Sequence, residues 1–117
     1  MNNIDNFISS GTWLPELFKF NRLNTSYVIV PIILKEEIID DKKTYTWIEI
    51  QIKEEKYTYE DVIDFIITLK YSISETIAII NNYMYDPENE KYKSEFKEFQ
   101  EFRTLVKNGV KKHFNKL

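Results

Sequence analysis

The spacing of hydrophobic residues changes near Thr58, and this change constrains the fold more than any other feature of the chain. Residues 26–34 and 45–53 are rich in β-branched and aromatic side chains, and a polar stretch at Asp40-Asp41-Lys42-Lys43 separates them. Such a pattern predicts two strands joined in an antiparallel hairpin. From Thr58 onward, apolar residues recur at helical spacing. Strands followed by helices predict an α+β fold, with a hairpin over 26–56 and a helical part over 57–117.

The two predicted strands differ in how their side chains are distributed. In the second strand, Ile48, Ile50 and Ile52 alternate with polar or aromatic residues, which predicts one buried face. The first strand is apolar on both faces, so we expect both of them to be covered. Pro31 has no amide hydrogen, which predicts an unpaired edge or a bulge where a partner strand or the N-terminal segment docks.

Three helices are predicted after the hairpin, two short and one long. Thr58 and Ser72 each stand where a side chain can accept an early amide hydrogen bond, and Glu75 completes a capping box with Ser72. The second helix is expected to end at Asp86-Pro87, because the residue before proline avoids the α conformation. On this helix, one apolar face is formed by Ile73, Ile77, Ile80 and Met84.

The long helix is expected over about residues 88–116. An apolar seam with steps of three and four residues predicts a packing face along it, formed by Tyr92, Phe96, Phe99, Phe102, Val106, Val110 and Phe114. Gly109 interrupts the seam. We expect it to end the helix in a left-handed conformation, with residues 110–117 forming a separate tail.

Residues 1–25 are predicted to form an irregular arm ahead of one α+β domain over residues 26–117. The arm is rich in aromatic residues but has no sustained period, and Pro15 suggests a short helical turn over 16–20. Its large side chains must be buried on the domain or on a neighbouring protein.

The residues needed for catalysis are scarce. The chain has no cysteine, one histidine (His113) and two glycines (Gly11 and Gly109), which excludes thiol chemistry, Cys/His zinc sites and glycine-rich phosphate loops. Glu60, Asp61 and Asp64 have the spacing to hold a divalent metal, but carboxylates at a helix N-terminus also stabilise the helix dipole, and we favour that role. His113 is expected at the surface. We therefore expect no enzymatic activity, no cofactor and no metal.

The charge pattern bears on possible partners. Between Lys35 and Asp64 there are ten acidic residues and five lysines, whereas after Glu101 there are five basic residues and no acidic one. Cations near a helix C-terminus are expected on electrostatic grounds alone, so we predict no nucleic-acid partner. No stretch approaches the roughly 20 apolar residues of a membrane span, and no secretory signal is expected at Met1.

The helical part resembles small proteins of tailed bacteriophages and prophages that are encoded among virion and tail-fibre genes. The resemblance covers about half the chain and rests on Tyr59-Glu60-Asp61-Val62-Ile63, Leu69-Lys70-Tyr71-Ser72, residues 75–82, Tyr92, Glu95-Phe96, Phe99-Gln100, Phe102-Arg103 and Lys107. It implies a head- or tail-fibre-associated structural protein, made in the host cytoplasm and located in the virion. The alternative is an assembly chaperone or a small inhibitor that binds a protein partner transiently.

Two surfaces are predicted to contact partners. One is the arm, through Trp13, Leu17, Phe18 and Phe20; the other is the doubly apolar strand, through Tyr27, Ile29 and Ile33. An exposed strand can add to the sheet of a neighbour. We expect the partners to be other virion or assembly proteins, with the chain itself forming a homo-oligomer.

Overall fold

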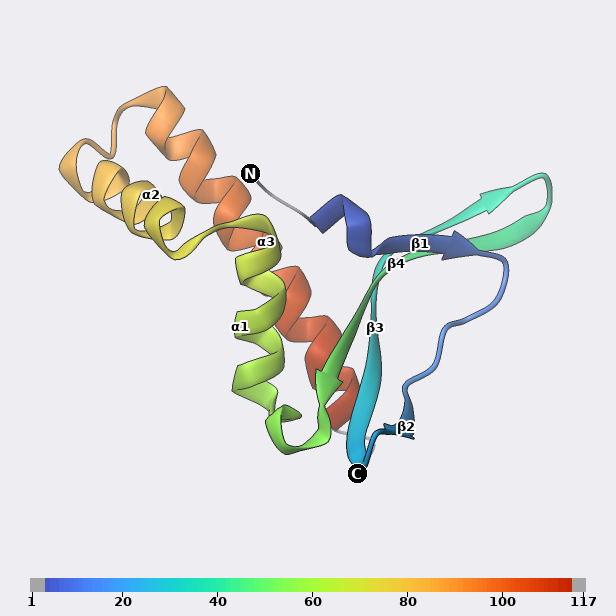
Figure 1. Cartoon of the computed structure of the whole chain (residues 1–117). Helices are drawn as coiled ribbons and strands as arrows, with labels where there is room; N and C mark the ends of the chain where they lie inside the picture. Colours follow the sequence, from blue (N-terminus) through green and yellow to red (C-terminus); the bar gives the residue numbers. More distant parts are fainter. Residues whose placement is uncertain (1–3, 115–117) are drawn as a thin grey trace.

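A computed structural model describes residues 4–114 and has a four-stranded antiparallel sheet with three helices on one side of it (Figure 1). The elements are η1 (Ile4–Phe7), β1 (Ile8–Gly11), β2 (Phe18–Arg22), β3 (Thr25–Ile39), β4 (Lys42–Lys53), η2 (Glu54–Lys56), α1 (Tyr59–Lys70), α2 (Ile73–Tyr85) and α3 (Glu90–Phe114). The predicted α+β fold is confirmed. Within residues 4–114, no helix has the length and apolar character needed to cross a membrane.

Strands β3 and β4 form the predicted hairpin, but they are longer than predicted because the turn between them is tighter. Asp40 and Asp41 have φ angles of 51° and 65°. Two left-handed residues in a two-residue loop match the twist of the flanking strands. The turn between β2 and β3 is built in the same way, with φ angles of 52° at Leu23 and 63° at Asn24.

Leu23→Asn is expected to stabilise the protein by about 0.5–1 kcal/mol, because asparagine tolerates the left-handed conformation that a leucine side chain disfavours. The Leu23 side chain is 90% exposed, so little packing is lost. Thermal unfolding followed by circular dichroism measures the change. Leu23→Ala is the matched control, since it removes the same side chain without relieving the backbone. Equal melting temperatures for the two variants would contradict the explanation.

The N-terminal segment is not the irregular arm that was predicted. It supplies both edge strands, and the sheet order is β1-β4-β3-β2. β1 pairs with β4 from Ile8 opposite Ile48, and β2 pairs with β3 from Phe18 opposite Ile29. The helical turn expected over 16–20 is also wrong. Strand pairing prevails there because Phe18 and Phe20 alternate with polar residues and fit one face of the sheet.

The main core lies between the helices and one face of the sheet. Its members are almost fully buried: Val28, Val30, Ile32, Ile48, Ile50 and Ile52 on the strands, Val62, Ile63 and Ile66 on α1, and Phe102, Val106 and Val110 on α3. The alternation predicted for β4 and the packing seam predicted for the long helix are both confirmed.

The helix boundaries follow from their caps. The Thr58 hydroxyl accepts a hydrogen bond from the Asp61 amide at 3.2 Å, and α1 begins at the next residue. The Ser72 hydroxyl accepts from the Glu75 amide at 3.0 Å, while the Glu75 carboxylate accepts from the Ser72 amide at 3.2 Å. This is the predicted capping box. Asp86 ends α2, as expected from Pro87.

The prediction that Gly109 ends the last helix is wrong. α3 continues to Phe114, and Gly109 has no positive φ. A Cβ atom built at Gly109 would lie 2.4 Å from Cγ2 of Ile32. The missing side chain therefore lets the helix approach β3 closely. The predicted stretch 115–117 lies outside the described residues.

His113, expected at the surface, is instead partly buried. Its Nε2–H donates a hydrogen bond to the backbone carbonyl oxygen of Pro31. The ring nitrogen is the donor in this pair because a carbonyl oxygen can only accept. Pro31 was predicted to mark an unpaired edge or a bulge. It lies on a stretch of β3 that β2 does not reach, so that edge has no paired strand there in the described residues. The bulge in β3 lies further along, between Ile33 and Lys35.

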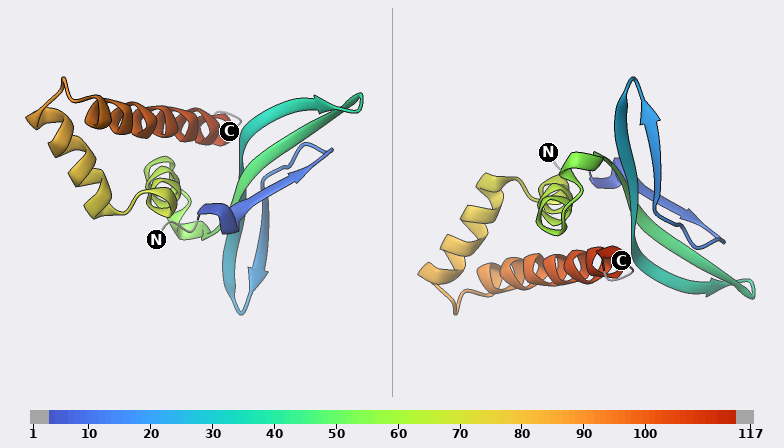
Figure 2. Two further views of the ribbon diagram at one scale, coloured as in Figure 1. Left: turned by 90° about the horizontal axis from the view of Figure 1, so that it is seen from above. Right: turned by 90° about the horizontal axis from the view of Figure 1, so that it is seen from below.

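The molecule is more extended than most chains of its length. Its radius of gyration is 16.4 Å, compared with about 13 Å expected for 117 residues. Helix α2, which packs against α3 and lies away from the sheet, and the projecting end of the β3–β4 hairpin both extend the molecule (Figure 2). α2 has no fully buried residue.

Candidate functional site

The face of the sheet that points away from the helices carries a group of aromatic and aliphatic side chains. Phe18 is opposite Ile29, and Phe20 is opposite Tyr27, so these four side chains share that face. The ring centroids of Phe20 and Tyr27 are 5.4 Å apart and stacked. The ring centroids of Phe18 and Phe20 are 6.3 Å apart.

Trp13 extends this face toward β1. The segment between β1 and β2 crosses from one edge of the sheet to the other, and Trp13 packs edge-on against Trp47 with their ring centroids 5.8 Å apart. Gly11 makes this contact possible, because a Cβ there would lie 2.5 Å from the Trp13 ring. The result is asymmetric: Trp47 is 3% exposed, whereas Trp13, which covers it, is 62% exposed.

We call this surface the aromatic face, formed by Trp13, Phe18, Phe20, Tyr27, Ile29, Ile33 and Trp47. It brings together six of the seven side chains predicted to contact partners. Leu17 is the exception, because it is partly buried against the main core. Phe18 is 55% exposed, whereas Phe20, Tyr27, Ile29 and Ile33 are half-buried. Leu14, which is an apolar residue of the same segment but was not among those predicted to contact partners, is also exposed.

A second apolar surface lies on α2. The apolar stripe predicted on this helix is mostly exposed, at Ile73, Ile77 and Met84, and only Ile80 is partly buried. α2 is held to α3 by its other side, where Tyr83 stacks on Phe96 with ring centroids 4.2 Å apart. We call the exposed stripe the α2 shoulder. The helical period had indicated an apolar face, but not that most of it would be exposed.

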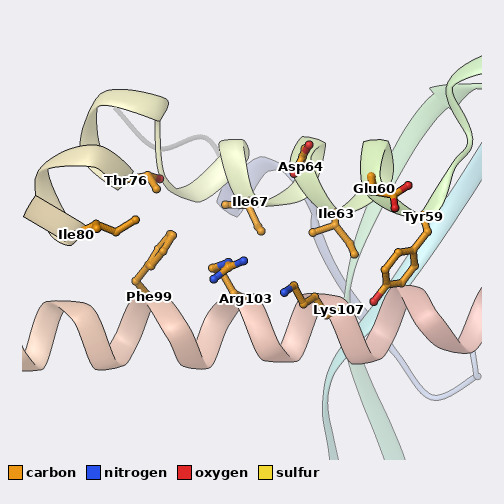
Figure 3. Close-up of a pocket in the computed structure, with 10 residues that line it drawn as sticks. All are labelled: Tyr59, Glu60, Ile63, Asp64, Ile67, Thr76, Ile80, Phe99, Arg103 and Lys107. Atoms are coloured by element: carbon orange, nitrogen blue, oxygen red, sulfur yellow. The ribbon is translucent and has the colours of Figure 1, made fainter.

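A groove of about 490 Å³ lies between α1, α2 and α3 (Figure 3). Its apolar lining comes from Ile63, Ile67, Ile80 and Phe99, together with Tyr59 and Thr76. Glu60 and Asp64 on α1 stand across from Arg103 and Lys107 on α3. The Arg103 guanidinium donates a hydrogen bond to the side-chain oxygen of Gln100 at 3.2 Å, and its Cζ lies 5.8 Å from the centre of the Phe99 ring.

The charged side chains on the two walls of the groove are open to solvent. Glu60, Asp64 and Lys107 are exposed to solvent, and Arg103 is half-buried. No ion pair within 4 Å joins the two walls among the described residues.

The perturbed titratable groups lie outside the groove's charged walls. Burial raises the pKa of Tyr57. Burial is also the larger cause of the raised pKa of Tyr71, and the negative charges of Glu98 and Glu75 add to it. The carboxylate of Glu36 and then Tyr45 raise the pKa of Lys43 on the surface of the β3–β4 hairpin. These shifts follow from packing and an ion pair, so they do not identify a catalytic acid or base.

Acidic residues at the start of α1 serve the helix itself. Glu60 and Asp61 stand in its first turn, where their charges favour the positive end of the helix dipole. Across residues 4–114, no three histidine, aspartate or glutamate side chains are grouped to hold a metal ion.

The chain has no significant match to a family model, to a curated protein sequence or to a solved structure.

Proposed function

We propose that this protein is a non-enzymatic structural component of a bacteriophage particle that acts through protein–protein contacts made by its aromatic face. The observation that carries the proposal is the exposure of large apolar side chains close together, with Trp13 62% and Phe18 55% exposed and Leu14 between them in sequence. Large apolar patches on a protein surface mark interaction sites. Aromatic residues are the ones most enriched at such sites.

The accessible surface supports an assembled state. The chain exposes 8328 Å², whereas a compact monomer of its mass exposes about 6,800 Å². The difference is larger than the roughly 800 Å² that one partner contributes to a standard interface. Association of copies, or of this chain with other virion proteins, removes part of this surface from water and stabilises the complex.

The setting in a virion rests on the resemblance of residues 57–117 to phage proteins encoded among structural genes. A transient assembly chaperone or inhibitor is the second candidate, and the α2 shoulder favours it, since an exposed helix stripe suits reversible helix packing. Mass spectrometry of purified particles separates the two. The structural component remains in the finished particle, whereas the transient factor is absent from it.

Trp13→Ser combined with Phe18→Ser is expected to abolish the assembly made through the aromatic face while leaving the fold in place, because both side chains are mostly exposed. Light scattering measures the oligomeric state. Far-UV circular dichroism and the melting temperature are expected to stay nearly unchanged. A collapse of the fold would show that these rings are core residues. A second pair, Leu14→Ser with Phe18→Ser, leaves the Trp13–Trp47 contact intact and is expected to weaken assembly as well.

The matched control removes two exposed apolar side chains elsewhere. Met84 and Tyr85 on α2 are 74% and 87% exposed, and their replacement by serine is expected to leave self-assembly unchanged. If the control pair disrupts assembly and the Trp13/Phe18 pair does not, the aromatic face is not the interface.

A further inference from the structure

One edge of β3 has no neighbouring strand over much of its length. β2 pairs with β3 only from Thr25 to Ile29, whereas β4 flanks the other edge of β3 as far as Ile39. In residues 4–114, no strand pairs with the outer edge of β3 beyond Ile29. Figure 2 shows the end of the β3–β4 hairpin projecting from the body of the molecule, with β1 beside β4 and no other strand beside the end of β3.

The turn fixes which backbone groups point outward along this edge. In a two-residue hairpin, the residues flanking the loop exchange both hydrogen bonds. Here they are Ile39 and Lys42. Hydrogen-bonded and non-hydrogen-bonded pairs then alternate, so the pair of Glu36 and Tyr45 is not hydrogen-bonded. The amide and carbonyl of Glu36 therefore point away from β4, toward the open edge.

The order of residues along this edge is self-complementary. The sequence from residue 33 to 39 is Ile-Leu-Lys-Glu-Glu-Ile-Ile. If a second copy pairs antiparallel about Glu36, Lys35 lies opposite Glu37 of that copy, and Glu37 lies opposite its Lys35. The apolar residues on either side, Ile33-Leu34 and Ile38-Ile39, then run alongside one another. Opposite charges in directly facing positions stabilise a sheet.

We propose that two copies of this chain join by the outer edges of β3, antiparallel and centred on Glu36, to form one continuous eight-stranded sheet. This inference rests on the proposed function, because it adds a second contact between copies to the one made by the aromatic face. The two Glu36 residues would face each other. Lys43 of each copy offsets this repulsion, since its Nζ lies 3.5 Å from a Glu36 carboxylate oxygen.

Charged side chains favour a second copy over other strands. Lysine and glutamate on an edge strand normally discourage pairing with other strands. In the single chain Lys35 and Glu37 already pair with each other, with Lys35 Nζ 3.2 Å from a carboxylate oxygen of Glu37. In the register centred on Glu36, each copy places its Lys35 opposite Glu37 of the other copy, so two facing pairs of opposite charge form. Ile38, which is 76% exposed in the single chain, gains an apolar neighbour in the same arrangement.

Cysteine crosslinking tests the register directly, because the chain has no cysteine of its own. Lys35→Cys and Glu37→Cys are prepared as separate full-length variants and then mixed under mild oxidation. In the proposed register, facing Cα atoms at positions 35 and 37 are about 4.5 Å apart, within disulfide reach. Position 35 is about 7–8 Å from its own counterpart, which is too far. The remaining Lys35–Glu37 pair between the mixed copies is retained.

A disulfide-linked dimer is expected in the mixture and not in either variant alone. Equal crosslinking in all three samples would overturn the proposal, as would no crosslinking in the mixture. Lys35→Glu provides a second measurement: it is expected to weaken self-association about tenfold or more, and adding Glu37→Lys is expected to restore it. If the double variant stays as weak as the single one, the facing charges are not paired.

The outcomes separate this inference from the proposed function. Loss of assembly in Trp13→Ser/Phe18→Ser, without crosslinking in the mixture, leaves the aromatic face as the interface and removes the β3 edge. Crosslinking that persists in the Trp13→Ser/Phe18→Ser background while larger assemblies are lost supports both contacts. Crosslinking that persists while larger assemblies are unchanged supports the edge and contradicts the aromatic face.

Discussion

Gly109→Ala is expected to lower the free energy of unfolding by about 1–3 kcal/mol, because the added methyl group overpacks the core. The new Cβ would lie 2.4 Å from Cγ2 of Ile32, a fully buried side chain. That methyl group is attached to the stiff branched carbon of isoleucine, so it cannot move aside without shifting the strand or the helix. The gain of about 1 kcal/mol in helix propensity is smaller than this cost.

Asn108→Ala is the matched control for Gly109→Ala. Asn108 is the adjacent residue on α3 and is exposed, so alanine there improves helix propensity without touching the sheet. A gain of a few tenths of a kcal/mol is expected. Urea unfolding followed by circular dichroism measures both variants. If Gly109→Ala also gained stability, close contact between α3 and β3 would not be the reason for a glycine at this position.

Phe102→Ala is expected to destabilise the protein by about 3–5 kcal/mol, a large part of the stability of a typical domain. Phe102 is 7% exposed and packs within the main core. Its ring centroid lies 5.9 Å from that of Tyr71, and the Lys70 ammonium is 4.8 Å from its centre. Removing the ring leaves a cavity where the end of α1 meets α3. Denaturant unfolding monitored by tryptophan fluorescence reports the loss.

Phe96→Ala tests whether position in the fold, rather than ring size, sets this cost. Phe96 is partly buried and stacks on Tyr83, so it attaches α2 to α3 without contributing to the main core. The expected loss is about 1–2 kcal/mol. Equal losses for Phe96→Ala and Phe102→Ala would indicate that the α2–α3 hairpin and the sheet unfold as one equally packed unit.

Local chemistry made much of the fold predictable. Thr58 and Ser72 begin α1 and α2 because their hydroxyls satisfy amide groups that the helix leaves unpaired. The alternation along β4 placed Ile48, Ile50 and Ile52 on one buried face, since successive strand residues point to opposite faces.

The features that were missed depend on contacts between distant parts of the chain. β1 is four residues long, with the polar Ser9 and Ser10 at its centre, and it exists because it pairs with β4. For β2 a local signal was present, since Phe18 and Phe20 alternate with Lys19 and Asn21. Gly109 is inside α3 because of Ile32, which is far away in sequence. In the same way, helical spacing predicted the apolar stripe of α2 but not that Ile73, Ile77 and Met84 would be exposed.

The sheet order β1-β4-β3-β2 also has a consequence for biosynthesis. β1 leaves the ribosome first, yet its partner is β4, so Ile8 must wait until Ile48 has been made. Pairing of β3 with β4 needs only a local turn and can begin as soon as both strands emerge. The β1 segment therefore joins the sheet late. Until then, Trp13 and Trp47 remain accessible to chaperones.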